Sequence, residues 1–365
     1  MLKKSRLNAV LGRMEKMGLE QMVVTDAISI LYLTEVWVDA CERLVALYIN
    51  KNGENRFFVN DMFHVPENVG VQVVRFTDTD PYLKMLADCT DHTKPLGVDK
   101  NIPARFLLPL MEIGAGTSYV NASICVDETR AFKDEEECQA MRLASAINDK
   151  AMERFKALLK PGITEREVAN QFKEIYQSLG ADDVSFPPSV CFGPDAAVGH
   201  YRCGDVALKE GDCILIDTGC IKDNYCADMT RTFFCGKVKD EEHKKVYELV
   251  LAANRAAEAM IKPGVRFCDI DAAARKVIAD AGYGDKFTHR LGHFIGMEVH
   301  DFGDVSSANE AVAQPGNIFS IEPGIYLEGN MGVRIEDLVL VTEDGCEVLN
   351  HYSKEFEIIG SSVTG

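Results

Sequence analysis

The sequence of 365 residues lacks the features that mark a secreted or membrane protein. No apolar run approaches the roughly 20 residues that a membrane-spanning helix needs. Lys3 and Lys4 stand near the start, but Arg13, Glu15 and Lys16 interrupt the apolar stretch that follows, so we expect no secretory signal. We therefore predict a cytoplasmic protein without a membrane partner.

Basic residues are few relative to acidic ones. The chain has 39 lysines and arginines against 57 aspartates and glutamates, which gives a formal net charge of −18. A nucleic-acid backbone or an anionic membrane surface attracts basic patches, so we expect neither as a partner. A divalent metal ion is compatible with this balance, because it would neutralise part of the negative charge locally.

Paired cysteine motifs are also missing. The twelve cysteines are scattered from Cys41 to Cys346, and none forms a C-x-x-C pair. Because we expect no secretory signal, we interpret them as reduced thiols in or near the core. A disulfide framework is the less favoured interpretation.

The length and the ordinary composition, 47% hydrophobic and 26% charged, indicate a soluble chain of two domains. The first domain, residues 1–130, is predicted to be α/β with a mixed or parallel sheet, because helical and strand patterns alternate in it. The periodicity predicts a helix over 7–17 and strands over 22–24, 44–49, 56–59, 71–74 and 96–99. The acidic stretch 134–137 suits a helix start and opens the second domain, residues 131–365.

The second domain contains an internal repeat. Lys160-Pro161-Gly162 recurs as Lys262-Pro263-Gly264, and a predicted helix follows each copy, over residues 164–179 in the first. Each half then leads to a segment with two acids, first Asp217 and Asp228, then Glu322 and Glu336. Such a duplicated α+β unit should pack about a pseudo-twofold axis, with the two acid-bearing hairpins meeting in one central sheet.

Asp217 and Glu322 each stand at the end of an apolar strand, and carboxylates brought together in such a setting would repel one another. Three of the eight histidines, His289, His293 and His300, lie within twelve residues between the two acid pairs. One acid alone is more often structural, but four in matched positions favour a metal site. Four carboxylates and one imidazole balance about two divalent cations, and such oxygen-rich ligation favours Mn²⁺ over structural Zn²⁺.

These motifs resemble those of the metallopeptidases with the pita-bread fold, most closely the Xaa-Pro dipeptidases (prolidases) and Xaa-Pro aminopeptidases. The resemblance spans nearly the whole chain, a creatinase-like N-terminal domain to about residue 130 followed by the catalytic domain. It is carried by residues 216–219, 227–232, 289–301, 321–326 and 332–337.

The resemblance implies two divalent ions, with Mn²⁺ favoured and Co²⁺ or Zn²⁺ as alternatives. The implied metal ligands are Asp217, Asp228, His293, Glu322 and Glu336. Asp217 would serve one ion and His293 with Glu322 the other, while the second acid of each hairpin would bridge them. A bridging hydroxide would then attack the scissile carbonyl of a small peptide.

Catalytic roles for further residues also follow from the resemblance. Glu322 would shuttle a proton, and His300 would stabilise the oxyanion. His289 and His200 would contact the substrate, and Arg334 would orient the ligands or the intermediate. A homodimer is implied as well.

Three positions depart from the common pattern of the family. Gly199 stands where proline is frequent, Phe294 where glycine is frequent, and Glu35 where glycine is usual. Creatinase-type amidinohydrolases lack the metal ligands, and methionine aminopeptidases generally lack the N-terminal domain. An aminopeptidase of other N-terminal specificity and a non-catalytic binding module stay open as alternatives, and the motifs suit a dipeptidase and a longer-peptide aminopeptidase equally.

Overall fold

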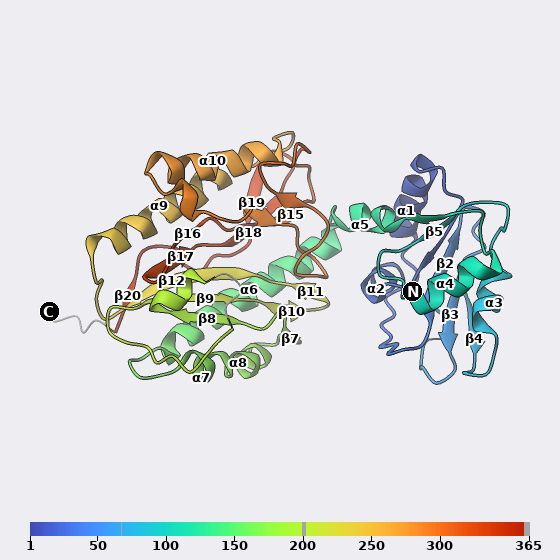
Figure 1. The fold of residues 1–365 in the computed structure, drawn as a ribbon, viewed down its shortest axis with the longest axis horizontal. Coiled ribbons are helices and arrows are strands. Elements are labelled where there is room, and N and C mark those ends of the chain that lie inside the picture. The colour runs from blue at the N-terminus through green and yellow to red at the C-terminus, as the bar shows by residue number, and fades with distance from the viewer. Residues whose placement is uncertain (67, 199–201, 361–365) are drawn as a thin grey trace. The chain divides into compact units, whose positions relative to one another are not determined.

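The computed structural model describes residues 1–66, 68–198 and 202–360. The chain divides into two compact units, Met1–Arg130 and Ala131–Gly365, which are both seen in Figure 1. Among the described residues, no helix combines the length and the apolar character that crossing a membrane requires. All twelve cysteines are free thiols, which confirms the interpretation of reduced cysteines.

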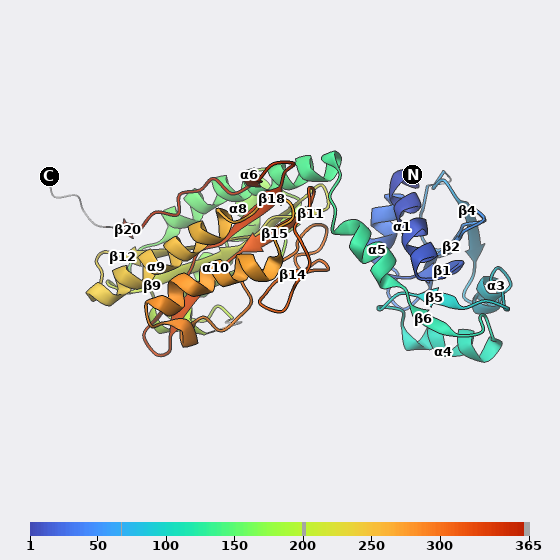
Figure 2. The same ribbon diagram turned by 90° about the horizontal axis from the view of Figure 1, so that it is seen from above.

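The first unit is a six-stranded mixed sheet in the order β4-β3-β2-β1-β5-β6. Figures 1 and 2 show α1 and α5 on one face of this sheet and α3 and α4 on the other. The strands are β1 (Gln21–Val24), β2 (Val45–Asn50), β3 (Arg56–Asn60), β4 (Gln72–Phe76), β5 (Leu96–Val98) and β6 (Tyr119–Asn121). The helices are α1 (Lys4–Lys16), α2 (Ala27–Thr34), α3 (Tyr82–Ala87), α4 (Ala104–Ile113) and α5 (Ser123–Arg130).

The central pair of this sheet explains its mixed character. β1 pairs antiparallel with β2 and parallel with β5. The five strands predicted from periodicity are confirmed within two residues, and the predicted helix is confirmed with a start three residues earlier than expected. β6 was not predicted, because it is short and its residues are half-buried or exposed, so its sequence carries no clear alternation.

Glu35 ends α2 in a left-handed conformation with φ of 60°. Only glycine adopts this conformation without steric cost, which accounts for the glycine that is usual at this position. The Glu35 carboxylate lies 2.9 Å from the amino group of Met1 and 3.0 Å from Lys3 Nζ. These two ion pairs offset part of the backbone strain.

The second unit repeats one order of elements, with long helices packed against strands that carry the site (Figure 1). The first half comprises α6 (Glu135–Leu158), α7 (Glu165–Ala169), α8 (Phe172–Ser178), β7 (Asp183–Val184), β8 (Ser189–Phe192), η1 (Gly193–Ala197), β9 (Cys213–Thr218), β10 (Cys220–Lys222), β11 (Tyr225–Cys226) and β12 (Met229–Cys235). The second half comprises α9 (Glu241–Glu258), α10 (Phe267–Asp280), η2 (Gly284–Lys286), β13 (Gly292–His293), β14 (Asp304–Val305), β15 (Ile318–Ile321), β16 (Gly324–Leu327), β17 (Met331–Arg334), β18 (Asp337–Val341), β19 (Cys346–Val348) and β20 (Ile358–Ile359).

The turns after the two Lys-Pro-Gly segments have the same backbone geometry. Gly162 and Gly264 have φ of 93° and 86°. Each donates its N–H over 2.8 Å to a carbonyl of the segment before an acid-bearing strand, that of Leu208 or of Ala313. The internal repeat seen in the sequence is therefore a repeat in structure.

The single helix predicted over residues 164–179 is two helices. The capping box of Thr164 and Glu167 is present as predicted and starts α7. The α7 helix ends at Ala169, and the C-cap residue Asn170 and Gln171 separate it from α8. Val168 and Phe172 still lie in one hydrophobic cluster, so the apolar pattern that suggested one helix reflects a shared buried face.

The two acid-bearing hairpins are β9–β12 and β15–β18, both antiparallel. The prediction that they meet in one sheet is wrong, because β9 and β12 belong to a sheet of order β20-β12-β9-β8 and β15 and β18 to one of order β15-β18-β19. Where the hairpins meet, single bonds replace a continuous ladder. Glu336 N–H donates to the Thr230 carbonyl (3.1 Å), and Thr232 Oγ1 donates to the Arg334 carbonyl (2.9 Å).

Candidate metal centre

The acidic residues singled out in the sequence stand where strands of the two hairpins begin or end. Asp217 lies near the end of β9, and Glu322 directly follows β15. Asp228 and Glu336 directly precede the return strands β12 and β18. The repeat thus places four carboxylates at the ends of its strands, and His293 ends the short strand β13 beside them.

The His293 imidazole lies at the centre of the cluster. Its Nε2 atom is 3.6 Å from Asp228 Oδ2, 3.6 Å from Glu322 Oε1 and 3.9 Å from Glu336 Oε1. Asp228, His293 and Glu336 each offer a ligand atom, and these atoms lie within 4.8 Å of one another. Side chains from distant positions of the chain therefore bring their ligand atoms close enough together to share a metal ion.

Asp217 reaches the cluster through Arg334. Arg334 Nη2 donates to Asp217 Oδ2 over 2.7 Å, and Arg334 Nε lies 4.0 Å from Glu322 Oε2. The guanidinium thus stands between the first acid of one hairpin and the first acid of the other. In this structure it supplies one positive charge to a group of four carboxylates.

Burial works against the charge of these acids. The side chains of Asp228 and Glu336 are about 5% and 3% exposed. Burial, and then the neighbouring carboxylates, raise the pKa of both well above the ordinary range, and burial raises the pKa of Glu322 to about 7. Either protons on the carboxylates or bound cations would relieve this repulsion.

Within the described part of the chain, two carboxylate oxygens of the cluster have no hydrogen-bond partner. Asp217 Oδ1 and Asp228 Oδ1 are buried and accept no hydrogen bond among the described residues. Buried polar atoms are normally satisfied, so such orphans call for an ion or another ligand. Burial also lowers the pKa of His293 to about 3, which keeps the imidazole neutral and its lone pair available. The donor set therefore fits divalent cations that prefer oxygen ligands.

The orientation of His293 is fixed by its neighbours. Its Nδ1 lies 3.2 Å from the Phe294 carbonyl, which selects the tautomer with the proton on Nδ1 and turns Nε2 toward the acids. Its backbone N–H donates to Ser320 Oγ over 3.0 Å, and Ser320 Oγ donates to Glu322 Oε1 over 3.2 Å. One serine thus supports two of the predicted ligands.

Arg334 and His289 are joined by Tyr326, a residue to which the sequence assigned no role. Arg334 Nη1 donates to Tyr326 Oη over 3.0 Å, and Tyr326 Oη lies 2.8 Å from His289 Nε2. His289 Nδ1 faces the Arg290 carbonyl at 2.7 Å and therefore carries the ring proton, so Nε2 accepts the proton of the Tyr326 hydroxyl. Burial lowers the pKa of His289 to about 4, which agrees with an accepting nitrogen. Tyr326 lies in the 321–326 motif that also contains Glu322, and its place in that motif is the sequence signal that could have identified it.

Two predicted site residues remain, His300 and His200. The His300 ring centre is 4.3 Å from that of His293, with the planes at 85°. His200 falls outside the described residues, as does Gly199. Thr230, which the sequence did not single out, donates from Oγ1 to Glu336 Oε2 over 2.7 Å and accepts from Arg334 Nε over 3.1 Å.

The position equivalent to His293 in the first half is occupied by Cys191. In β8, Cys191 pairs with Leu215, which lies two residues before Asp217. The bridge between Phe294 and Phe319 places His293 opposite Ser320, two residues before Glu322. The histidine therefore breaks the symmetry of the repeat at a position where the other half has a buried thiol.

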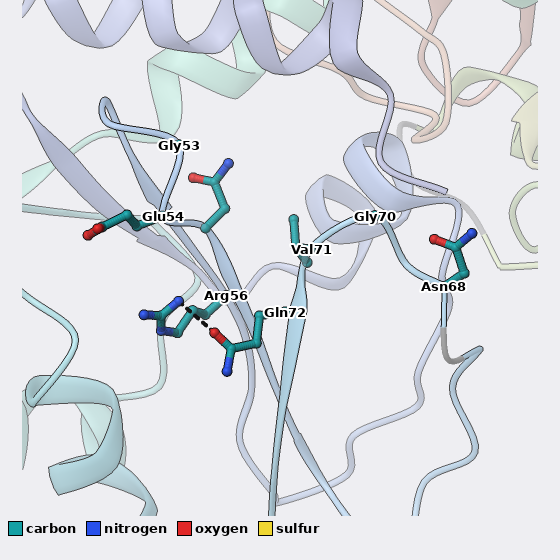
Figure 3. Close-up of a pocket in the computed structure, with 8 residues that line it drawn as sticks. Gly53, Glu54, Arg56, Asn68, Gly70, Val71 and Gln72 are labelled. Atoms are coloured by element: carbon teal, nitrogen blue, oxygen red, sulfur yellow. Dashed lines mark hydrogen bonds between the residues drawn. The ribbon is translucent and has the colours of Figure 1, made fainter.

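A hollow on the first unit has none of this chemistry. It encloses about 710 Å³ at the start of β3 and β4, and Figure 3 shows its lining side chains. Arg56 is held there by Gln72 Oε1 over 2.9 Å. Its lining residues are Gly53, Glu54, Asn55, Arg56, Asn68, Gly70, Val71 and Gln72. One glutamate and no histidine among them make a poor metal or catalytic site.

Comparison with known proteins decides the family. Residues 139–343 match metallopeptidase family M24, and residues 6–132 match the creatinase/prolidase N-terminal domain. The chain belongs to metallopeptidase family M24. It is therefore a peptidase-family hydrolase, and its family uses divalent metals, in agreement with the carboxylate and histidine cluster.

Relatives match the M24 chain over nearly its whole length. An uncharacterized peptidase of Staphylococcus aureus (strain bovine RF122) is 34% identical over 354 residues, which are 96% of this chain and 100% of the relative. A prolidase from Thermococcus sibiricus is 32% identical, with a TM-score of 0.91 over 98% of this chain and 100% of its own. A dipeptidase from Pyrococcus horikoshii is 31% identical, with a TM-score of 0.91 over 97% and 100%. The creatinase-like and pita-bread architecture expected from the sequence is thus confirmed.

Proposed function

We propose that this M24 protein is a two-metal Xaa-Pro peptidase, which hydrolyses the bond between an N-terminal residue and a following proline. The observation that carries the proposal is the cluster around His293, whose carboxylates are buried or half-buried and in part without hydrogen-bond partners among the described residues. The names of similar structures, a prolidase and a dipeptidase, favour small peptides as substrates.

Five side chains would hold two ions in this proposal. They are Asp217, Asp228, His293, Glu322 and Glu336. The second acids of the two hairpins, Asp228 and Glu336, would help to hold the ions, and each precedes a return strand at the meeting point of the halves. Oxygen-rich ligation favours Mn²⁺, with Co²⁺ or Zn²⁺ as alternatives. When bound, the ions would polarise the scissile carbonyl and lower the pKa of a water molecule.

The protein's own groups would handle the proton and the developing charge. Glu322 would accept the proton of the attacking water and pass it to the leaving proline nitrogen. His300, beside His293, would donate to the carbonyl oxygen as it becomes negative. Arg334 would keep Asp217 in place through its 2.7 Å bond.

The proposed substrate contact of His289 has a structural condition. Its Nδ1 lies 2.7 Å from the Arg290 carbonyl and its Nε2 2.8 Å from Tyr326 Oη, so both ring nitrogens are engaged. A substrate would therefore exchange with one of these bonds or contact the ring itself. The substrate contact proposed for His200 stays a prediction.

A digest tests the proposal. Metal-free protein is reloaded with Mn²⁺, Co²⁺ or Zn²⁺ and incubated with Xaa-Pro dipeptides, Xaa-Pro-Xaa tripeptides and matched Xaa-Ala dipeptides. We expect metal-dependent release of the N-terminal residue from proline substrates, and the ratio of dipeptide to tripeptide cleavage assigns the enzyme as a dipeptidase or an aminopeptidase. Preferred cleavage of Xaa-Ala would replace the proposal by an aminopeptidase of other specificity. A folded, metal-loaded sample without activity would replace it by a binding module.

We also propose a homodimer, which the resemblance to this family implies. Light scattering after gel filtration should give about twice the chain mass of 40.4 kDa. A single-chain mass would remove the dimer from the proposal. The cytoplasmic location stays a prediction.

A further inference from the structure

An ion pair outside the metal centre is as deeply buried as the centre itself. Lys133 Nζ lies 3.4 Å from Asp301 Oδ2, and the two side chains are 1% and 3% exposed. Removing two charges from water costs more than such a pair usually returns, so a buried pair is weak evidence for stability and suggests a positional role.

The ion pair involves the segment that carries His300, because Asp301 belongs to that segment. Asp301 follows His300 directly, and its backbone N–H donates to the Phe294 carbonyl over 2.8 Å. That carbonyl also faces His293 Nδ1 at 3.2 Å. Phe294 N–H in turn donates to the Gly303 carbonyl over 3.2 Å, so the segment 294–303 folds back on itself. Through its ion pair, the Asp301 carboxylate ties this folded segment to the buried side chain of Lys133.

Gly296 leaves the space that the pair needs. A Cβ atom at Gly296 would stand 2.4 Å from Asp301 Oδ2 and 3.0 Å from Lys133 Cε. Both distances are too short for ordinary contact, so any other residue would displace one of the partners. The backbone of Lys133 is itself fixed, because its N–H donates to the Gly316 carbonyl over 2.8 Å.

We propose that Lys133 is a positioning residue that holds Asp301 and thereby sets the place of His300 beside the metal centre. The inference rests on the catalytic role of His300 in the proposed function. Lys133 is separated from His300 by 167 positions in sequence, and no motif of the site includes it. The metal ligand His293 has an independent support in Ser320 Oγ, so metal binding should not depend on Lys133.

The first test compares the single variant Lys133→Met with a double variant that carries no charge at position 133 or 301. Lys133→Met removes the charge but keeps the apolar stem, and the double variant Lys133→Met/Asp301→Asn avoids an unpaired buried charge if the single variant folds poorly. We expect kcat to fall about ten- to a hundredfold in both, with unchanged metal content. Lys239→Met is the matched control, because Lys239 Nζ binds Asp212 Oδ1 over 2.7 Å in the same unit. The control should keep wild-type kcat.

The second test separates positioning from a general structural effect. If Lys133 acts through His300, Lys133→Met should not slow the His300→Ala variant further. In ¹⁵N-histidine-labelled protein, the ring resonance assigned by its loss in His300→Ala should shift or broaden in Lys133→Met and stay unchanged in Lys239→Met. Additive losses of kcat, loss of metal, or an unmoved resonance would each overturn the proposal. If wild-type protein cleaves no Xaa-Pro peptide, the proposed function fails, whereas the resonance still decides on Lys133.

Discussion

The carboxylate of Asp228 is a charged group in a place that suits a neutral one. It is buried, its Oδ1 accepts no hydrogen bond among the described residues, and its Oδ2 lies 3.6 Å from His293 Nε2. Bound cations would satisfy the oxygens of this carboxylate and would neutralise its charge without a proton.

The Asp228→Asn variant should weaken binding of both proposed ions. The amide keeps the size of the side chain but loses the charge that a bridging ligand offers to each ion. We expect a loss of about a hundredfold or more in affinity for each, measured by isothermal titration with Mn²⁺. Asp212→Asn is the control, because Asp212 is also buried but is paired with Lys239. Unchanged affinity at one of two sites would remove Asp228 from the bridge.

The pKa of Glu322, raised to about 7 by burial, makes the stability of metal-free protein depend on pH. In the unfolded chain this carboxyl titrates near 4.5. Between these values the folded state holds a proton that the unfolded state has lost, so the stabilising contribution of Glu322 is full below about pH 4.5 and falls as pH rises toward 7.

Chelated wild-type protein should therefore lose stability relative to Glu322→Gln as pH rises from 5 to 7. The slope should approach at most about 1.4 kcal/mol per pH unit, and denaturant unfolding in the presence of a chelator measures it. Parallel stability profiles for the two proteins would show that Glu322 is not held protonated by burial.

Charged residues of the site were predictable from the sequence, whereas their uncharged supports were not. Spacing and the repeat singled out the acids and His293, and four of these five lie within 4 Å of another in one cluster. Ser320, Thr230 and Tyr326 are ordinary residue types, and their partners lie at distances that only the folded chain sets. Thr230, for example, meets Glu336 from 106 positions away.

At the scale of elements, the site depends on how closely short strands approach one another. β13 carries His293 and passes directly beside β15, which leads to Glu322. At Gly292 a Cβ atom would stand 1.8 Å from the Ser320 carbonyl oxygen. This contact is with backbone, so no side-chain rotation can relieve it, and glycine is required for the approach.

The Gly292→Ala variant should accordingly lose metal. The added methyl group would push β13 away from β15 and move His293 relative to Glu322. We expect metal content to fall below half of the wild-type value and the unfolding temperature to drop, by elemental analysis and calorimetry. Gly345→Ala serves as control, since a Cβ there meets nothing within 4 Å and should change neither. Wild-type metal content in Gly292→Ala would contradict the close approach.

Element types followed from periodicity, but their connections did not. Five strands of the first unit and the repeat of the second were predicted because apolar alternation and turn residues mark them locally. The interruption between α7 and α8 and the separation of the two hairpin sheets were not. The meeting of the two hairpins depends on hydrogen bonds between distant segments, such as that from Glu336 to Thr230, which no local pattern encodes.

On the scale of the whole molecule, duplication explains both the symmetry of the centre and its departure from symmetry. Each half of the second unit supplies a hairpin with two acids. The second half alone supplies His293, and Cys191 stands at the equivalent position of the first. Arg334 binds Asp217 at 2.7 Å but stands 4.0 Å from Glu322, so the first acids of the two hairpins also differ in surroundings. Two ions held here would therefore be inequivalent.

The central claim is that this cluster is a centre for two divalent ions. Titration of metal-free protein with Mn²⁺, followed by calorimetry and elemental analysis of the dialysed complex, tests it most directly. We predict two ions per chain with distinct affinities, and protons released as the buried carboxylates lose them to the metal. Binding of fewer than two ions by a folded sample, or of two indistinguishable ions, would contradict the account.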